Sequence, residues 1–135
     1  MDKQGVIQFL KSRVGLFKDF DVGRIEELAQ GSRITTFEAG EAAIAFGEEV
    51  RFLGVLLDGE AEASITDDAG DRHVLARLGP SEVFGEMELM TGNKSVADII
   101  GVTRCTALFI PIGLFYTHIA TNLASIGCLS RIIME

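Results

Sequence analysis

The sequence predicts one mainly β domain in which α-helices flank a closed arrangement of short strands. Its 135 residues suffice for a single domain with a real core but are too few for two of ordinary size. Short apolar or alternating runs, typical of strands, fill the stretch from Ser32 to Ile110. Turns rich in glycine separate these runs at regular intervals, which favours a roll, barrel or sandwich. Helical spacing of apolar residues is found at both ends of the chain.

Two short helices are predicted at the N-terminus. Residues 6–17 carry apolar side chains near helical spacing. Asp21 has the residue type and position of an N-cap for a second helix, and Gly31 provides a stop, so this helix should end near Gln30.

The central stretch divides into segments with strand composition. The predicted strands are 33–37, 42–46, 52–57, 61–65, 73–78, 96–102 and 105–110. Asp58–Gly59 and Ala69–Gly70 are predicted as hairpin turns between neighbouring strands.

One segment interrupts the strands. Residues 84–92 (FGEMELMTG) are too rich in Glu, Met and Leu to continue a strand, so we predict a short helix from Phe84 to Thr91. The apolar side chains of this segment are expected to pack in the core or against its own loop; they are Phe84, Met87, Leu89 and Met90.

The C-terminal stretch is predicted to be helical. Pro111 fits the first helical position, and apolar residues follow at helical spacing in two helices or in one helix bent near Asn122. The single domain therefore comprises N-terminal helices (1–31), a β region (32–110) and C-terminal helices (111–135). Because the chain stops within an apolar periodic pattern, we expect it to be a fragment of a longer protein that carries the effector region.

Composition argues against several classes of function. A net charge of −8 repels nucleic-acid phosphates, and the 12 Lys and Arg residues are scattered. The apolar runs are too short for a membrane span, and the N-terminus lacks a secretory signal, so a cytoplasmic location is expected.

The sequence offers no catalytic or metal-binding motif. Cys105 and Cys128 lack ligand spacing and are expected to be buried, reduced thiols. His73 and His118 have no catalytic companions, and the acidic cluster at 67–71 fits a hairpin turn better than a calcium loop. We expect no enzyme activity, no cofactor and no metal.

A set of residues at characteristic spacings resembles the cyclic-nucleotide-binding domain family. Before the short helix the matching residues are Phe37, Gly40, Glu41, Ile44, Gly47, Phe52, Val55, Gly59, Leu78, Gly79 and Pro80, and from the helix onward they are Phe84, Gly85, Glu86, Leu89 and Ala97. The family includes catabolite-activator proteins, regulatory subunits of cyclic-nucleotide-dependent kinases and cyclic-nucleotide-gated channels. The resemblance implies an antiparallel double-stranded β-roll of jelly-roll type and a regulatory role in signal transduction, with cAMP or cGMP as the candidate ligand.

Within this resemblance, residues 84–97 are similar to the phosphate-binding cassette. The ligand-binding residues that it implies are Phe84, Gly85, Glu86, Met87, Lys94, Ser95, Val96 and Ala97. Gly85 permits close backbone approach, Glu86 matches the ribose ligand, and Ala97 would offer a backbone amide to the phosphate. The short helix would direct its positive end toward an anion.

The cassette departs from the family pattern at the arginine that usually pairs with the phosphate. Ser95 stands at that position. Without the arginine, the charge-assisted contact with the phosphate is lost, which is expected to cost about 1.5–3 kcal/mol of binding free energy. Lys94 is the nearest substitute, although neighbours in extended chain point in opposite directions. Arg51, Arg72 and Arg77 are further candidates if the fold directs them inward.

Two functional interpretations remain. In the first, a cyclic nucleotide or another small anion binds the cassette and moves the C-terminal helices. In the second, Ser95 marks a degenerate domain that serves as an interaction or dimerisation unit. The alternative to a ribose contact for Glu86 is that it caps the first turn of its short helix or bonds to a neighbouring backbone amide. A homodimer seam is predicted along Leu123, Ile126, Leu129 and Ile132.

Overall fold

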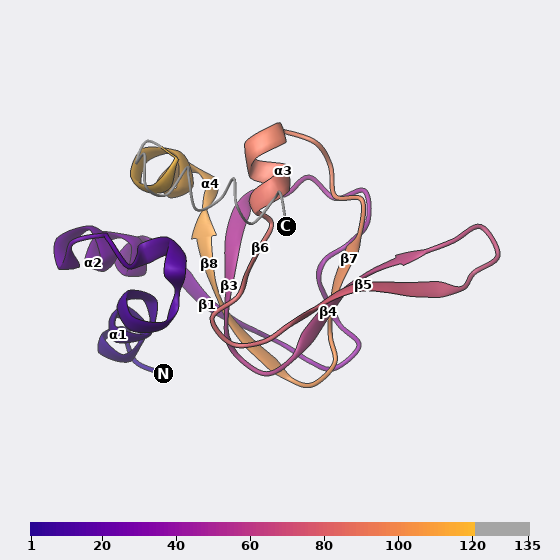
Figure 1. Cartoon of the computed structure of the whole chain (residues 1–135), viewed down its shortest axis with the longest axis horizontal. Coiled ribbons are helices and arrows are strands. Elements are labelled where there is room, and N and C mark those ends of the chain that lie inside the picture. The colour runs from indigo at the N-terminus through magenta and orange to yellow at the C-terminus, as the bar shows by residue number, and fades with distance from the viewer. Residues whose placement is uncertain (121–135) are drawn as a thin grey trace.

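The computed structural model describes residues 1–120, which form two facing β-sheets (Figure 1). The helices that precede and follow the strands gather at one end, and a further short helix lies over the roll. The helical elements are α1 (Lys3–Arg13), η1 (Gly15–Phe17), α2 (Val22–Gly31), α3 (Glu86–Thr91), α4 (Ile112–Leu114) and η2 (Phe115–Ile119). The strands are β1 (Arg33–Phe37), β2 (Ala42–Ile44), β3 (Phe52–Asp58), β4 (Ala61–Thr66), β5 (Arg72–Leu78), β6 (Val83–Phe84), β7 (Asp98–Gly101) and β8 (Cys105–Pro111).

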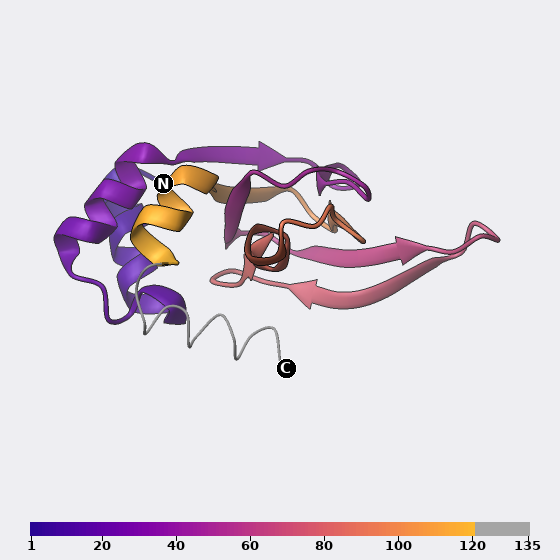
Figure 2. The same ribbon diagram turned by 90° about the horizontal axis from the view of Figure 1, so that it is seen from above.

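All strand pairs within the two sheets are antiparallel, which confirms the predicted β-roll. One sheet has the order β1-β8-β3-β6 and the other the order β2-β7-β4-β5. Figure 2 shows the β4–β5 hairpin projecting away from the end where α1, α2 and α4 lie. None of the helices within residues 1–120 is long and apolar enough to span a membrane.

The N-terminal helices begin at carboxylate caps. Asp2 accepts a hydrogen bond from the amide of Gly5 at 2.8 Å, so α1 begins before the predicted range of 6–17. It ends at Arg13 because Val14 is extended, and the apolar residues that follow form the separate turn η1. The predicted cap of the second helix is confirmed, since Asp21 accepts from the amide of Arg24 at 2.8 Å.

One of the two predicted hairpins is wrong. Asp58–Gly59 joins β3 to β4, and these strands belong to different sheets, so the turn carries the chain across the roll. Gly59 has φ +94°, and a Cβ there would lie 2.4 Å from the carbonyl oxygen of Arg104. The Ala69–Gly70 turn is confirmed as a hairpin because β4 and β5 pair directly.

The predicted internal helix is present but shorter than expected. Phe84 does not belong to this helix. It lies in β6, a strand that the sequence did not indicate, and pairs there with Gly54 of β3. The helix begins after Gly85, whose φ of +89° breaks the path between strand and helix. Likewise the strand predicted at 96–102 is restricted to β7, since Ser95 and Val96 belong to the loop after α3.

The C-terminal segment turns into helix directly after β8. Pro111 is the cap rather than the first helical residue, with φ −58° and ψ 150°. A single turn, α4, leads into the π-helical segment η2. The predicted bend near Asn122, Cys128 and the predicted dimer seam lie outside the described residues.

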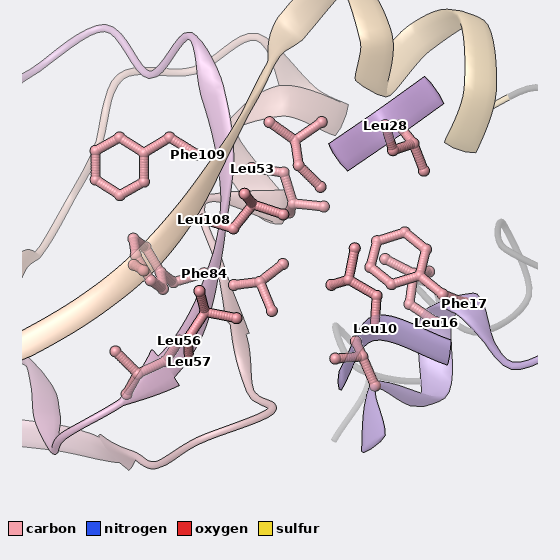
Figure 3. Packing of buried hydrophobic residues seen from close by; sticks show 14 of the residues in the cluster. Leu10, Leu16, Phe17, Leu28, Leu53, Leu56, Leu57, Phe84, Leu108 and Phe109 are labelled. Atoms are coloured by element: carbon pink, nitrogen blue, oxygen red, sulfur yellow. The ribbon is translucent and has the colours of Figure 1, made fainter. Parts of the chain in front are cut away.

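A continuous hydrophobic core links the helices to the roll and fixes the segment that precedes α3. Figure 3 shows Leu53 and Leu108 on the side of their strands that faces Leu28 of α2, while Phe84 and Phe109 lie on the opposite side. This alternation follows from the two-residue period of a strand. Burial on both faces therefore fixes β3 and β8, and β3 pairs with β6, the strand before α3.

Candidate ligand-binding site

The passage from β6 into α3 needs glycine at position 85. A Cβ added to Gly85 would lie 2.9 Å from the carbonyl oxygen of Phe52 and 3.3 Å from Cγ1 of Val50. Its positive φ also disfavours any side chain. This glycine therefore presses the start of α3 against the end of β3 and fixes the direction in which the next residue, Glu86, projects.

Glu86 holds a buried carboxyl oxygen without a partner. Its Oε2 is inaccessible to solvent and has no hydrogen-bond partner among the described residues. The pKa of the Glu86 carboxyl is raised above its ordinary value of 4.5, first by burial and further by the charge of Glu88, while the backbone amide of Glu86 opposes the shift. A buried acceptor in this state is costly unless a donor meets it.

Ser95 closes the loop that follows α3. Its side chain is 4% exposed, and Oγ donates to the carbonyl of Ala97 at 2.7 Å and accepts from the amide of Ala97 at 3.3 Å. Its backbone bonds to Gly47 and Glu48 in the loop after β2. The Ala97 amide, which the family resemblance offered to a phosphate, is thus already engaged within the chain.

The other predicted site residues divide between the interior and the surface. Phe84 is buried and makes edge contacts with the rings of Phe52 and Phe109. Lys94 and Val96 are exposed, so Lys94 points to solvent where its neighbour Ser95 points inward.

The two methionines of α3 correct the expectation that they pack in the core. Met87 and Met90 are 49% and 42% exposed, whereas Leu89 is buried. A six-residue helix presents only one face to the roll, and residues three apart share a face, so Met87 and Met90 lie together on the outer one.

The three arginines proposed as substitutes are engaged elsewhere or lie away from the cassette. Arg51 pairs with Glu49 at 3.2 Å, and both side chains are well exposed. Arg72 pairs with Glu62 at 2.7 Å across the β4–β5 hairpin. Arg77 lines a separate cavity of about 170 Å³. Within residues 1–120, none of them is bonded to the cassette.

The acidic turn and His73 behave as structural groups. Asp67 accepts hydrogen bonds from the amides of Ala69 and Asp71, which closes the β4–β5 hairpin. His73 lies on the exposed strand β5 and hydrogen-bonds Asp67 at 2.7 Å, which lowers the pKa of that carboxyl. No group of residues within 1–120 has the composition and proximity of a metal site.

Sequence reasoning missed the residue that joins the cassette helix to the C-terminal segment. The hydroxyl of Tyr116 donates to the carbonyl of Leu89 at 2.7 Å. A second contact holds the same segment to α2, because His118 hydrogen-bonds Glu27 at 2.7 Å. Tyr116 is the chain's sole tyrosine, which is the only feature of the sequence that singles it out. Its contact with α3 depends on the fold.

The β-roll thus positions a short helix that carries a buried carboxyl oxygen without a partner within residues 1–120, and Tyr116 links this helix to the segment after β8. Residues 34–122 match the family model of the cyclic nucleotide-binding domain. The chain belongs to that family.

Similar proteins are regulatory. The chain is 26% identical over 106 residues to a cAMP-dependent protein kinase regulatory subunit from Dictyostelium discoideum, covering 75% of this chain and 32% of that one. The chain thus spans about a third of the length of this relative.

Solved structures share the fold. A mutant regulatory subunit of a cAMP-independent protein kinase A from Trypanosoma brucei, bound to cAMP in the A site, has a TM-score of 0.88 at 24% identity, covering 98% of this chain and 47% of that one. The corresponding subunit from Trypanosoma cruzi, bound to guanosine, has a TM-score of 0.87 at 23% identity, covering 98% and 46%.

Proposed function

We propose that this domain is a regulatory module whose cassette binds a ribose-bearing small molecule through Glu86. The observation that carries the proposal is the buried Oε2 atom without a donor. A carboxylate only accepts hydrogen bonds, and a ribose hydroxyl is a neutral donor. A ligand hydroxyl would therefore satisfy the group that the protein leaves unsatisfied.

The ligands of the solved relatives support a ribose in this position. One relative is described with cAMP and another with guanosine, and these two molecules share a purine riboside but differ in the phosphate. Glu86 and Gly85 are the cassette residues retained here, whereas the phosphate-pairing arginine is replaced by Ser95. The ribose contact is thus the part of the family's recognition that this chain keeps.

Binding would reach the C-terminal segment through α3. Glu86 and Leu89 lie one turn apart on this helix, and the carbonyl of Leu89 accepts from Tyr116. A ligand that shifts the first turn of α3 would change this bond and the position of η2. The His118–Glu27 contact would then carry the shift to α2.

The effector on which the module acts would belong to other parts of a longer protein, as in the relatives that this chain covers only in part. A homodimer through the C-terminal residues and a cytoplasmic location remain part of the proposal. The charge of −8 argues against direct contact with nucleic acid.

Calorimetric titration with adenosine, guanosine, cAMP and cGMP tests the proposal. We expect saturable binding of at least one of them, and Glu86→Gln should weaken it at least tenfold because an amide is a poorer acceptor than a carboxylate. Glu88→Gln is the matched control, since it removes the same charge from the same helix without touching the unpartnered oxygen. Binding that survives Glu86→Gln unchanged would contradict the proposal.

A second candidate function is a degenerate domain that acts as an interaction unit. The hydrogen bonds between Ser95 and Ala97 favour it, because they close the loop without any ligand. Absence of heat with all four compounds up to millimolar concentration would select this alternative.

A further inference from the structure

We infer that the cassette selects neutral ribonucleosides over cyclic nucleotides and other phosphate-bearing ligands. The inference rests on the proposed function, since it specifies the class of ligand that Glu86 receives. It follows from three features of the described residues: the charge around the cassette, the state of its backbone amides, and the donor requirement of Glu86.

Several carboxylic acid residues lie on the cassette or on the segments that border it. Glu86 and Glu88 both lie in the first turn of α3. The loop after β2, which bonds the backbone of Ser95 through its residues 47 and 48, carries the exposed Glu48. The carboxylate of Asp98 accepts from the amide of Phe46 in that loop. A ligand phosphate would therefore approach several negative groups.

The basic side chains nearby in sequence do not offset this charge. Lys94 points to solvent, and Arg51 is paired with Glu49 on the surface. No ion pair within residues 1–120 brings a lysine or arginine to Glu86, Glu88 or Asp98. Phosphate recognition in proteins normally needs such a cation, so the cassette lacks the main source of affinity for a cyclic nucleotide.

Of the backbone amides that could donate to a phosphate, that of Ala97 already has an acceptor within the chain. Ala97 donates its amide to Ser95 Oγ, so a phosphate would have to displace this bond. The positive end of α3 already faces the two carboxylates of its first turn, Glu86 and Glu88. Both features disfavour an anion at this position.

Hydrogen-bond chemistry points in the same direction. The ionised phosphate of a cyclic nucleotide only accepts hydrogen bonds, and Glu86 Oε2 also only accepts. A 3′,5′-cyclic nucleotide keeps only its 2′-hydroxyl as a sugar donor, because the other two oxygens are esterified. A free ribonucleoside keeps all of its ribose hydroxyls as donors, so it matches an acceptor-rich cassette better.

The test is a calorimetric comparison of adenosine with cAMP and of guanosine with cGMP. We expect the preferred nucleoside to bind at least tenfold more tightly than its cyclic nucleotide, and 2′-deoxyadenosine to bind at least tenfold more weakly than adenosine. Ser95→Arg should reverse the preference by adding a guanidinium beside Ala97. Val74→Arg is the matched control: it adds the same charge at an exposed position of β5, outside the cassette, and should leave the ratio unchanged.

The outcomes separate the two proposals. If none of the ligands binds, the proposed function itself is wrong. If cAMP binds as tightly as adenosine and Glu86→Gln weakens both, the ribose site stands and the selectivity for nucleosides is wrong. If Val74→Arg changes the ratio as much as Ser95→Arg, general charge rather than the position of Ser95 sets the preference, which also overturns the inference.

Discussion

The hydroxyl of Tyr116 and the carbonyl of Leu89 are 2.7 Å apart and join two helical segments that are separated by 27 residues in the sequence. Leu89 is buried on the inner face of α3, one turn after Glu86. Tyr116 belongs to the π-helical segment that follows β8. A single hydrogen bond thus connects the helix that carries the candidate ligand group to the segment that leads out of the described fold.

Tyr116→Phe should uncouple these segments with a modest loss of stability. The variant removes one neutral hydrogen bond, which is worth about 0.5–1.5 kcal/mol. Hydrogen exchange of residues 112–119, measured with and without the tightest nucleoside, should show ligand-dependent protection in the wild type and much less in the variant. Equal protection in both proteins would mean that the coupling runs through another contact.

Glu86→Gln should alter how stability depends on pH. Because the pKa of Glu86 is raised in the folded state, the unfolded chain ionises first as pH rises above 4.5. The Glu86 carboxyl therefore lowers the free energy of unfolding of the wild type as pH rises from 4.5 to the raised pKa of the folded state. Above that pKa the loss stays constant. Urea unfolding at pH 4 and pH 7 should show little difference between the proteins at pH 4 and a more stable Glu86→Gln at pH 7.

The same linkage predicts the pH dependence of binding. A ribose hydroxyl that donates to Glu86 stabilises the ionised carboxylate, so the affinity should fall as pH is lowered through the raised pKa. An affinity for adenosine that is constant from pH 7 down to pH 4.5 would contradict a direct contact with this carboxylate.

Gly54→Ala should destabilise the roll because it collides with Phe84. A Cβ at Gly54 would lie 2.2 Å from Cζ of the Phe84 ring, which is buried. Overpacking of this kind costs about 1–3 kcal/mol. Thermal unfolding should show a lower midpoint for Gly54→Ala, and Phe84→Leu in the same chain should recover part of the loss.

Gly113→Ala is the control for this prediction. It adds the same methyl group where no atom lies within 4 Å, in the single helical turn α4. Alanine is a better helix former than glycine, so this variant should be as stable as the wild type or slightly more stable. A similar loss in both variants would show that the Phe84 contact is not the cause.

Ser95→Ala should loosen the loop after α3. It removes the hydroxyl that bonds both backbone groups of Ala97, and we expect a loss of about 1–2 kcal/mol in urea unfolding. Ser12→Ala, which removes an exposed hydroxyl bonded to a helix carbonyl, should cost little or nothing. A Ser95→Ala variant as stable as the wild type would show that these bonds do not hold the loop.

The sequence by itself determined the elements whose causes are local. Asp21 caps α2 because a short acidic side chain can reach the first free amides, and Gly70 turns the β4–β5 hairpin because its φ of +86° favours glycine. The strand runs and glycine turns predicted the β-roll, and the residues at 84–97 indicated the cassette through their spacing alone.

Only the tertiary structure decided the features that depend on distant partners. The Asp58–Gly59 turn proved to be a crossover because β3 pairs with β6 and β8 rather than with β4, and β6 is too short to have a recognisable pattern. The buried position of Ser95 depends on backbone hydrogen bonds to residues 47 and 48. The hydrogen bond from Tyr116 to Leu89 forms because the fold places the segment after β8 next to α3. These contacts arise between segments far apart in the chain, so local composition carries no trace of them, and they determine which groups of the cassette remain free to meet a ligand.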